Sequence, residues 1–111
     1  MYKLRDAPDV SNLFTKVEIR FNHYNNGNLS CLLWDIDNNE PYCVATKNLH
    51  MLNSKKKAYV DLNNCGLSMI YFLEENEIAK PLGSAISEGY CVYPLYEFDL
   101  KMNNKIFYFL N

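Results

Sequence analysis

The side chains best suited to catalysis or metal binding, four cysteines and two histidines, are scattered along this sequence. The cysteines are separated by 12, 22 and 26 positions: Cys31, Cys43, Cys65 and Cys91. No C-x-x-C pair occurs, and His23 and His50 stand in no spacing typical of a zinc site. We therefore expect structural or surface roles for both histidines, and no metal or cofactor. Cys91 is the one thiol that merits attention as a nucleophile, but buried structural packing is the commoner role of a free cysteine.

The segment Asp35–Glu40 carries oxygen-bearing side chains at alternate positions, as a calcium-binding loop does. Two essential positions do not match. Glu40 stands where the loop needs glycine for its sharp bend, and Thr46 stands where a bidentate glutamate should close the site. The segment is therefore expected to form a polar turn rather than a calcium site.

A second polar cluster, made of Asp61, Asn63 and Asn64, lies where a predicted strand meets a predicted helix. The free amides at a helix start bind anions, so a small-molecule or nucleotide site is one interpretation. Capping of the helix is the simpler one, because these residue types accept hydrogen bonds from first-turn amides. Glycine-rich phosphate loops and a G-x-S-x-G elbow are absent from the sequence. This pattern favours a protein that is not an enzyme.

The segment Gly89–Asp99 contains four aromatic rings within nine residues: Tyr90, Tyr93, Tyr96 and Phe98. Such rings fill cores and also dominate interfaces, so both interpretations stay open. Residues 83–99 include no lysine or arginine, which disfavours direct binding of a phosphate backbone. Our candidates for a protein-binding surface are Tyr90, Tyr93, Tyr96 and Glu97, with Trp34 and Tyr59 as weaker ones.

The composition predicts a single domain over residues 1–111, because 49% hydrophobic content in a chain of this length supports one core. Thirteen acidic and eleven basic residues give a net charge of −2 and no basic stripe for nucleic acid. The N-terminus lacks a signal-peptide pattern, and no apolar run is long enough for a membrane span. These features predict a protein of the reducing cytoplasm, with no membrane partner and four thiols.

The periodicity predicts an α+β fold in which an antiparallel sheet of five or six strands packs against one main helix. The expected strands cover residues 16–22, 29–36, 41–49, 58–62, 90–98 and 105–110. The helix is expected to be capped by Asn63 or Asn64 and to run to about Ala79, before Pro81. A short helix over residues 9–14 is also considered. Asn25–Asn28 contains the Asn-Gly pair of a tight hairpin turn.

Four short segments together resemble a known family: Glu40–Tyr42, Val60–Asn64, Ala79–Gly83 and Gly89–Phe98. The last is the most specific, and the resemblance covers about residues 29–99. The family consists of small proteins of unknown function carried by phages, plasmids and conjugative elements of gut bacteria, many of them Firmicutes. The resemblance supplies no catalytic residues. It implies a mobile-element context, in which small proteins often block host defence, as anti-CRISPR proteins do.

These observations lead to two hypotheses of function. The preferred one is a binding protein of a phage or mobile element that inhibits a host defence protein, a CRISPR effector or a restriction enzyme, by steric occlusion in the bacterial cytoplasm. The alternative is a module that sequesters a small molecule or nucleotide with Asp61, Asn63 and Asn64. In either case the apolar segment Lys105–Leu110 is expected to form a terminal strand whose edge could pair with a second copy, or which could as easily fill the sheet.

Overall fold

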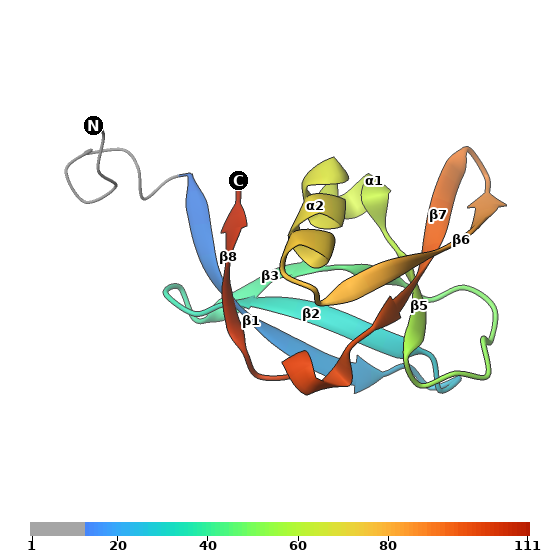
Figure 1. Cartoon of the computed structure of the whole chain (residues 1–111), viewed down its shortest axis with the longest axis horizontal. Coiled ribbons are helices and arrows are strands. Elements are labelled where there is room, and N and C mark those ends of the chain that lie inside the picture. Colours follow the sequence, from blue (N-terminus) through green and yellow to red (C-terminus); the bar gives the residue numbers. More distant parts are fainter. Residues whose placement is uncertain (1–12) are drawn as a thin grey trace.

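The computed structural model, which describes residues 13–111, contains two antiparallel sheets of four strands each (Figure 1). The first sheet has the order β3-β2-β1-β8. Its strands are β1 (Phe14–His23), β2 (Leu29–Asp35), β3 (Glu40–Val44) and β8 (Ile106–Leu110). The second sheet has the order β4-β5-β7-β6. Its strands are β4 (Thr46–Lys47), β5 (Lys57–Val60), β6 (Ala79–Glu88) and β7 (Cys91–Phe98).

The helical part is small and lies between β5 and β6 in the chain. It consists of α1 (Leu62–Cys65) and α2 (Leu67–Glu75), and a 3-10 helix, η3 (Leu100–Met102), joins β7 to β8. The buried side chains of both sheets and of α2 form one hydrophobic cluster, whose largest fully buried members include Phe98, Ile19, Leu33 and Met69. The predicted α+β fold with antiparallel strands is therefore confirmed.

The prediction of one sheet with five or six strands is wrong, and Ala45 shows the physical reason. Residues 41–49 look like one strand in the sequence, but the chain changes sheets at this residue. The Ala45 N–H donates to the Cys31 carbonyl in the first sheet, and the Ala45 carbonyl accepts from the Asp61 N–H beside the second. β3 and β4 are thus separate strands on either side of a buried, small residue.

β6 was not predicted at all, because Lys80–Gly83 was interpreted as the end of a helix. Pro81 cannot donate a hydrogen bond, but an edge strand tolerates this. Gly83 has a φ of +84°, and the register with β7 shifts between Pro81 and Ala85. Most of β6 is exposed and shows no alternation of polar and apolar residues. Its pairing with β7, rather than its own pattern, makes it a strand.

The single helix expected up to about Ala79 is also wrong in detail. Gly66 adopts a φ of +73° and separates α1 from α2, and α2 ends at Glu75 with Asn76 as its C-cap. The N-cap is Asp61 rather than Asn63 or Asn64. The short helix considered for residues 9–14 lies largely outside the described residues, and Phe14 opens β1.

The turn predicted at Asn25–Asn28 is confirmed, with Gly27 at a φ of +88°. Its last residue, Asn28, is buried and has a role that the sequence did not indicate. The Asn28 side chain donates to Asn48 Oδ1 and to the His50 carbonyl, and it accepts from the Leu52 N–H. It therefore fixes the loop between β4 and β5.

The polar turn predicted after β2 is confirmed and is organised by Asp35. The Asp35 carboxylate accepts from the Asn38 N–H at 3.1 Å and from Asn38 Nδ2 at 2.8 Å. These hydrogen bonds from Asn38 hold the pKa of Asp35 below its ordinary value.

We expect this lowered pKa to appear in the pH dependence of stability. A depressed folded-state pKa adds stability above the unfolded-state pKa, and this stability is lost as the pH falls through the folded-state value. Urea unfolding at neutral pH and at about pH 3 should therefore show a smaller loss for Asp35→Asn than for the wild type. Asp37→Asn, an exposed substitution in the same turn, is the control. Equal losses in the wild type and Asp35→Asn would contradict the assignment.

Candidate functional site

The tip of the β6–β7 hairpin presents the most exposed aromatic residue of the predicted set. Glu88 pairs with Cys91, so the connecting loop contains only Gly89 and Tyr90. Gly89 has a φ of +63° and Tyr90 does not have a positive φ, which is the pattern of a type II′ turn. Tyr90 has a relative exposure of 108%, and Val92 is exposed as well. We call Glu88, Tyr90 and Val92 the arm surface.

Tyr93 and Tyr96 belong to the core rather than to the arm surface. The Tyr96 O–H donates to Glu74 Oε2 at 2.6 Å, and burial together with this bond raises the pKa of Tyr96. Burial and the neighbouring Cys91 thiol likewise raise the pKa of Tyr93, with smaller effects from the charges of Asp61 and Glu88. The sequence left open whether these rings pack in the core or form a binding surface. Tyr93 and Tyr96 pack in the core.

The remaining members of the predicted binding set lie apart from one another. Glu97 is half-buried, and its Oε1 atom lies 3.6 Å from Lys80 Nζ. Tyr59 is buried, and its hydroxyl lies 3.2 Å from Nε2 of His50. The predicted residues therefore do not form one continuous surface.

Trp34 lies in the other sheet, on the face that points away from the core. Its ring is covered by the Arg20 guanidinium, whose central carbon lies 4.1 Å from the ring centroid. Arg20 Nε also donates to Glu18 Oε1 at 2.7 Å, and Glu18 is the cross-strand partner of Trp34. The three side chains form a cluster that partly shields the indole from solvent.

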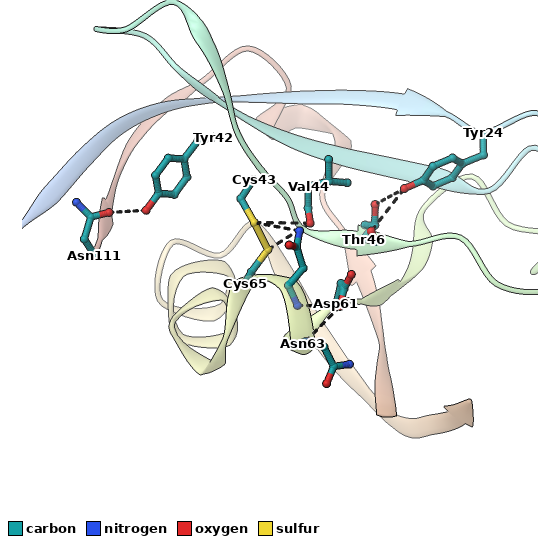
Figure 2. The surroundings of a disulfide bond; sticks show 10 residues. Tyr24, Tyr42, Cys43, Val44, Thr46, Asp61, Asn63, Cys65 and Asn111 are labelled. Carbon is teal, nitrogen blue, oxygen red and sulfur yellow. Dashed lines mark hydrogen bonds between the residues drawn. A yellow bond between two sulfur atoms is a disulfide. The ribbon is translucent and has the colours of Figure 1, made fainter. Parts of the chain in front are cut away.

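The alternative ligand site, at Asp61, Asn63 and Asn64, has its helix-start amides already bonded to the Asp61 side chain. Asp61 Oδ1 accepts from the Asn63 N–H at 3.2 Å and from the Asn64 N–H at 3.1 Å. An anion would have to displace this carboxylate to reach the same amides. Figure 2 shows Asp61 at the start of α1 and Asn63 within it, near a disulfide bond. Capping, the simpler interpretation of this cluster, is confirmed.

The expectation of four thiols is wrong, because the structure pairs Cys43 of β3 with Cys65 of α1 (Figure 2). Only Cys31 and Cys91 are free. Burial raises the pKa of Cys31 to about 12, which keeps it a neutral packing group. The 22-residue separation of Cys43 and Cys65 was visible in the sequence, but the pairing depends on α1 folding back against β3.

A groove of about 690 Å³ that sequence patterns did not indicate lies where α2, β6, β7 and η3 meet. Its charged lining comes from residues far apart in the chain: Lys56, Glu74, Glu77, Lys80, Glu97, Asp99 and Lys101. Two of the carboxylates already have side-chain partners, because Glu74 accepts from Tyr96 and Glu97 pairs with Lys80. The groove is therefore mixed in charge.

Within residues 13–111, no group of three or more His, Cys, Asp or Glu side chains is arranged to hold a metal ion. No helix in this part of the chain is long and apolar enough to cross a membrane.

Comparison with known proteins matches residues 17–108 to the family described as Domain of unknown function (DUF4313). No curated protein and no solved structure matches the chain.

Proposed function

We propose that this chain, which belongs to the DUF4313 family, is a small non-enzymatic binding protein of a phage or mobile genetic element that inhibits a bacterial defence protein by steric occlusion. The observation that carries the proposal is the arm surface, where Tyr90 is fully exposed on a two-residue turn. A fully exposed tyrosine at this position stabilises the fold little, so we expect its ring to act through contact with a partner.

The geometry of the arm suits a hot spot of binding. Tyrosine is among the residues that contribute most at interfaces, since its large ring and polar tip lose little conformational entropy on binding. The tight turn fixes the backbone beneath Tyr90, and Val92 adds apolar area beside it. A protruding ring on a rigid hairpin can enter a pocket of a partner and block it.

The charge of the arm favours a partner with a basic surface. Residues 83–99 contain no lysine or arginine, and Glu88 stands next to the turn. CRISPR effectors and restriction enzymes must carry basic surfaces to hold nucleic acid, and opposite charges speed association and favour the correct partner. Occupation of such a surface would exclude the nucleic acid without any chemical step.

Affinity capture with matched tyrosine variants tests this proposal. Tagged wild-type protein, Tyr90→Ala and Tyr71→Ala are exposed to lysate of a bacterium that carries the candidate defence systems. Tyr71 is the control because it is also a largely exposed tyrosine, at 62%, but lies on α2. We expect a nucleic-acid-binding defence protein to be retained by wild type and Tyr71→Ala, with roughly 30-fold weaker binding to Tyr90→Ala.

The same variants give a functional measurement. In a host with an active defence system, expression of the wild type should raise the plating efficiency of a targeted phage, and Tyr90→Ala should not. Equal protection by wild type and Tyr90→Ala would contradict the role of the arm. Co-purification of a metabolite in place of any protein would contradict the inhibitor proposal itself.

The groove beside η3 supports a second candidate function, the binding of a small molecule. Its volume of about 690 Å³ lies within the range of ligand pockets, and lysines and carboxylates converge on it. A zwitterionic or charged metabolite would suit this lining better than an apolar one. If the capture experiment yields a metabolite, Lys101→Glu should abolish its retention, whereas Tyr90→Ala should not.

A cytoplasmic location remains part of the proposal, and the disulfide places a condition on it. Reducing cytoplasm converts Cys43 and Cys65 to free thiols. The domain must then keep its fold without this covalent link.

A further inference from the structure

Among the strands of residues 13–111, β8 is the outermost of the first sheet and has β1 as its one partner. Its inner side chains, Phe107 and Phe109, contact Phe72 of α2 with ring centroids 6.1 and 5.1 Å apart. Its other side chains, Ile106, Tyr108 and Leu110, have exposures of 49%, 63% and 55%. The side chains of β8 are therefore packed on one face and exposed on the other. Figure 1 shows β8 running beside β1.

The hydrogen-bond pattern shows which backbone groups of β8 point outward. The Ile19 N–H donates to the Lys105 carbonyl, and the Asn111 N–H donates to the Leu13 carbonyl. Antiparallel strands alternate between residues that bond to the neighbour and residues that do not. Lys105, Phe107, Phe109 and Asn111 therefore face β1, whereas Ile106, Tyr108 and Leu110 direct their N–H and C=O groups to the free edge.

Nothing in the described residues satisfies or protects this edge. No backbone or side-chain group between residues 13 and 111 bonds to the outward groups of Ile106, Tyr108 or Leu110. The strand sequence Ile-Phe-Tyr-Phe-Leu contains no proline and no charge, and its pairing with β1 has no bulge. Natural edge strands usually carry a proline, a charged residue or a bulge, each of which hinders pairing with another chain.

We propose that β8 pairs with β8 of a second copy in antiparallel register about a two-fold axis at Tyr108. In this register Tyr108 faces Tyr108 of the second copy, and Ile106 faces its Leu110. All three outward residues then form hydrogen-bonded pairs, each of which exchanges two backbone bonds. Their exposed side chains come together as one apolar stripe on the outer face. If the register between the two β8 strands shifted by one residue, the outward N–H and C=O groups of one copy would face residues whose backbone groups already bond to β1. The ladder of hydrogen bonds between the copies would then be lost.

The charges near β8 permit this pairing. Lys16 is the cross-strand partner of Tyr108, and Glu18 is the partner of Ile106. In the dimer the two Lys16 side chains are separated by three strand spacings, about 14 Å. This exceeds the roughly 8 Å over which charges interact at physiological ionic strength.

The size of the contact sets its strength. A five-residue strand with three exposed side chains buries less than the roughly 1,200 Å² at the lower end of stable interfaces. We therefore expect a reversible dimer with a dissociation constant in the micromolar range. This inference does not depend on the proposed inhibitor function.

Analytical ultracentrifugation over about 1 to 500 µM tests the dimer. The wild type should pass from a 13.0 kDa monomer to twice that mass. Tyr108→Pro should weaken dimerisation at least tenfold, because it removes an N–H that points outward while the bonds to β1 remain. Tyr71→Lys, which places a charge on an exposed tyrosine of α2, should dimerise as the wild type does.

A charge-swap experiment keeps the test decisive if the proline variant fails to fold. Position 108 faces itself across the axis, so Tyr108→Lys and Tyr108→Glu should each be monomeric. A mixture of the two variants should form a heterodimer. A wild type that stays monomeric throughout, or dimers that persist unchanged in Tyr108→Lys, would overturn the proposal.

Discussion

Reduction of the Cys43–Cys65 disulfide is expected to lower the free energy of unfolding by about 3 kcal/mol. The bond closes a loop between residues 22 positions apart and so restricts the unfolded chain. It also ties α1 to β3, beside a weak polar contact from Asn64 Nδ2 to Cys43 Sγ at 3.7 Å. Urea unfolding with and without a reducing agent measures the difference, and thiol titration confirms the redox state.

The double variant Cys43→Ser/Cys65→Ser provides the matched control. Its urea midpoint of unfolding should equal that of the reduced wild type, and this midpoint should not change when the reducing agent is added. Cys91→Ser should behave as the wild type does, because Cys91 is free. Identical unfolding of fully oxidised and fully reduced wild type would refute a stabilising role of the bond. Because a cytoplasmic inhibitor must work in the reduced form, the same experiment measures how much stability remains there.

Substitution of Asn28 by alanine is expected to destabilise the protein by about 3 kcal/mol. The side chain is 3% exposed and makes three hydrogen bonds, of 3.1 Å to Asn48, 2.9 Å to the His50 carbonyl and 2.9 Å from the Leu52 N–H. Alanine would leave these partners unsatisfied near the core. Chemical denaturation measures the loss, and hydrogen exchange of the Leu52 amide should report the opening of the loop.

Two variants separate the role of Asn28 from a general effect of the turn. Asn25→Ala changes an exposed residue of the same turn and should alter stability by less than about 0.5 kcal/mol. Asn28→Asp keeps an acceptor for the Leu52 N–H but places a buried carboxylate oxygen against Asn48 Oδ1 and the His50 carbonyl, so it should destabilise the protein at least as much as Asn28→Ala. An Asn28→Ala variant as stable as Asn25→Ala would show that water replaces the lost bonds.

Elements with a regular local pattern were predictable from the sequence. Residues 16–22 alternate between polar and apolar side chains and lie within β1, and the segments predicted at 90–98 and 105–110 contain β7 and β8. The segment predicted at 58–62 covers all of β5 except Lys57. The Asn-Gly turn before β2 needs a positive φ, and Gly27 provides it. In each case the signal lies within a few neighbouring residues.

Elements defined by distant partners were not predictable. β6 has no alternation and contains Pro81 and Gly83, and it is a strand because β7 pairs with it. The division of residues 41–49 at Ala45 depends on hydrogen bonds to Cys31 and Asp61. A local pattern cannot show which of two sheets a strand will join.

For the candidate site, residue types alone indicated that the Gly89–Asp99 segment was important but not which rings were exposed. Tyr90, Tyr93 and Tyr96 have the same side chain, yet the first is fully exposed and the others are buried. The exposure of Tyr90 follows from its place in the two-residue turn, while α2 supplies Glu74 to the hydroxyl of Tyr96.

The sequence by itself determined the α+β class, most strands and the absence of basic residues along the arm, because hydrophobic periodicity, turn chemistry and charge are properties of neighbouring residues. Only the tertiary structure decided the two-sheet arrangement, the Cys43–Cys65 pair, the groove beside η3 and the open edge of β8. These features join segments far apart in the chain, and their position depends on how the whole core packs.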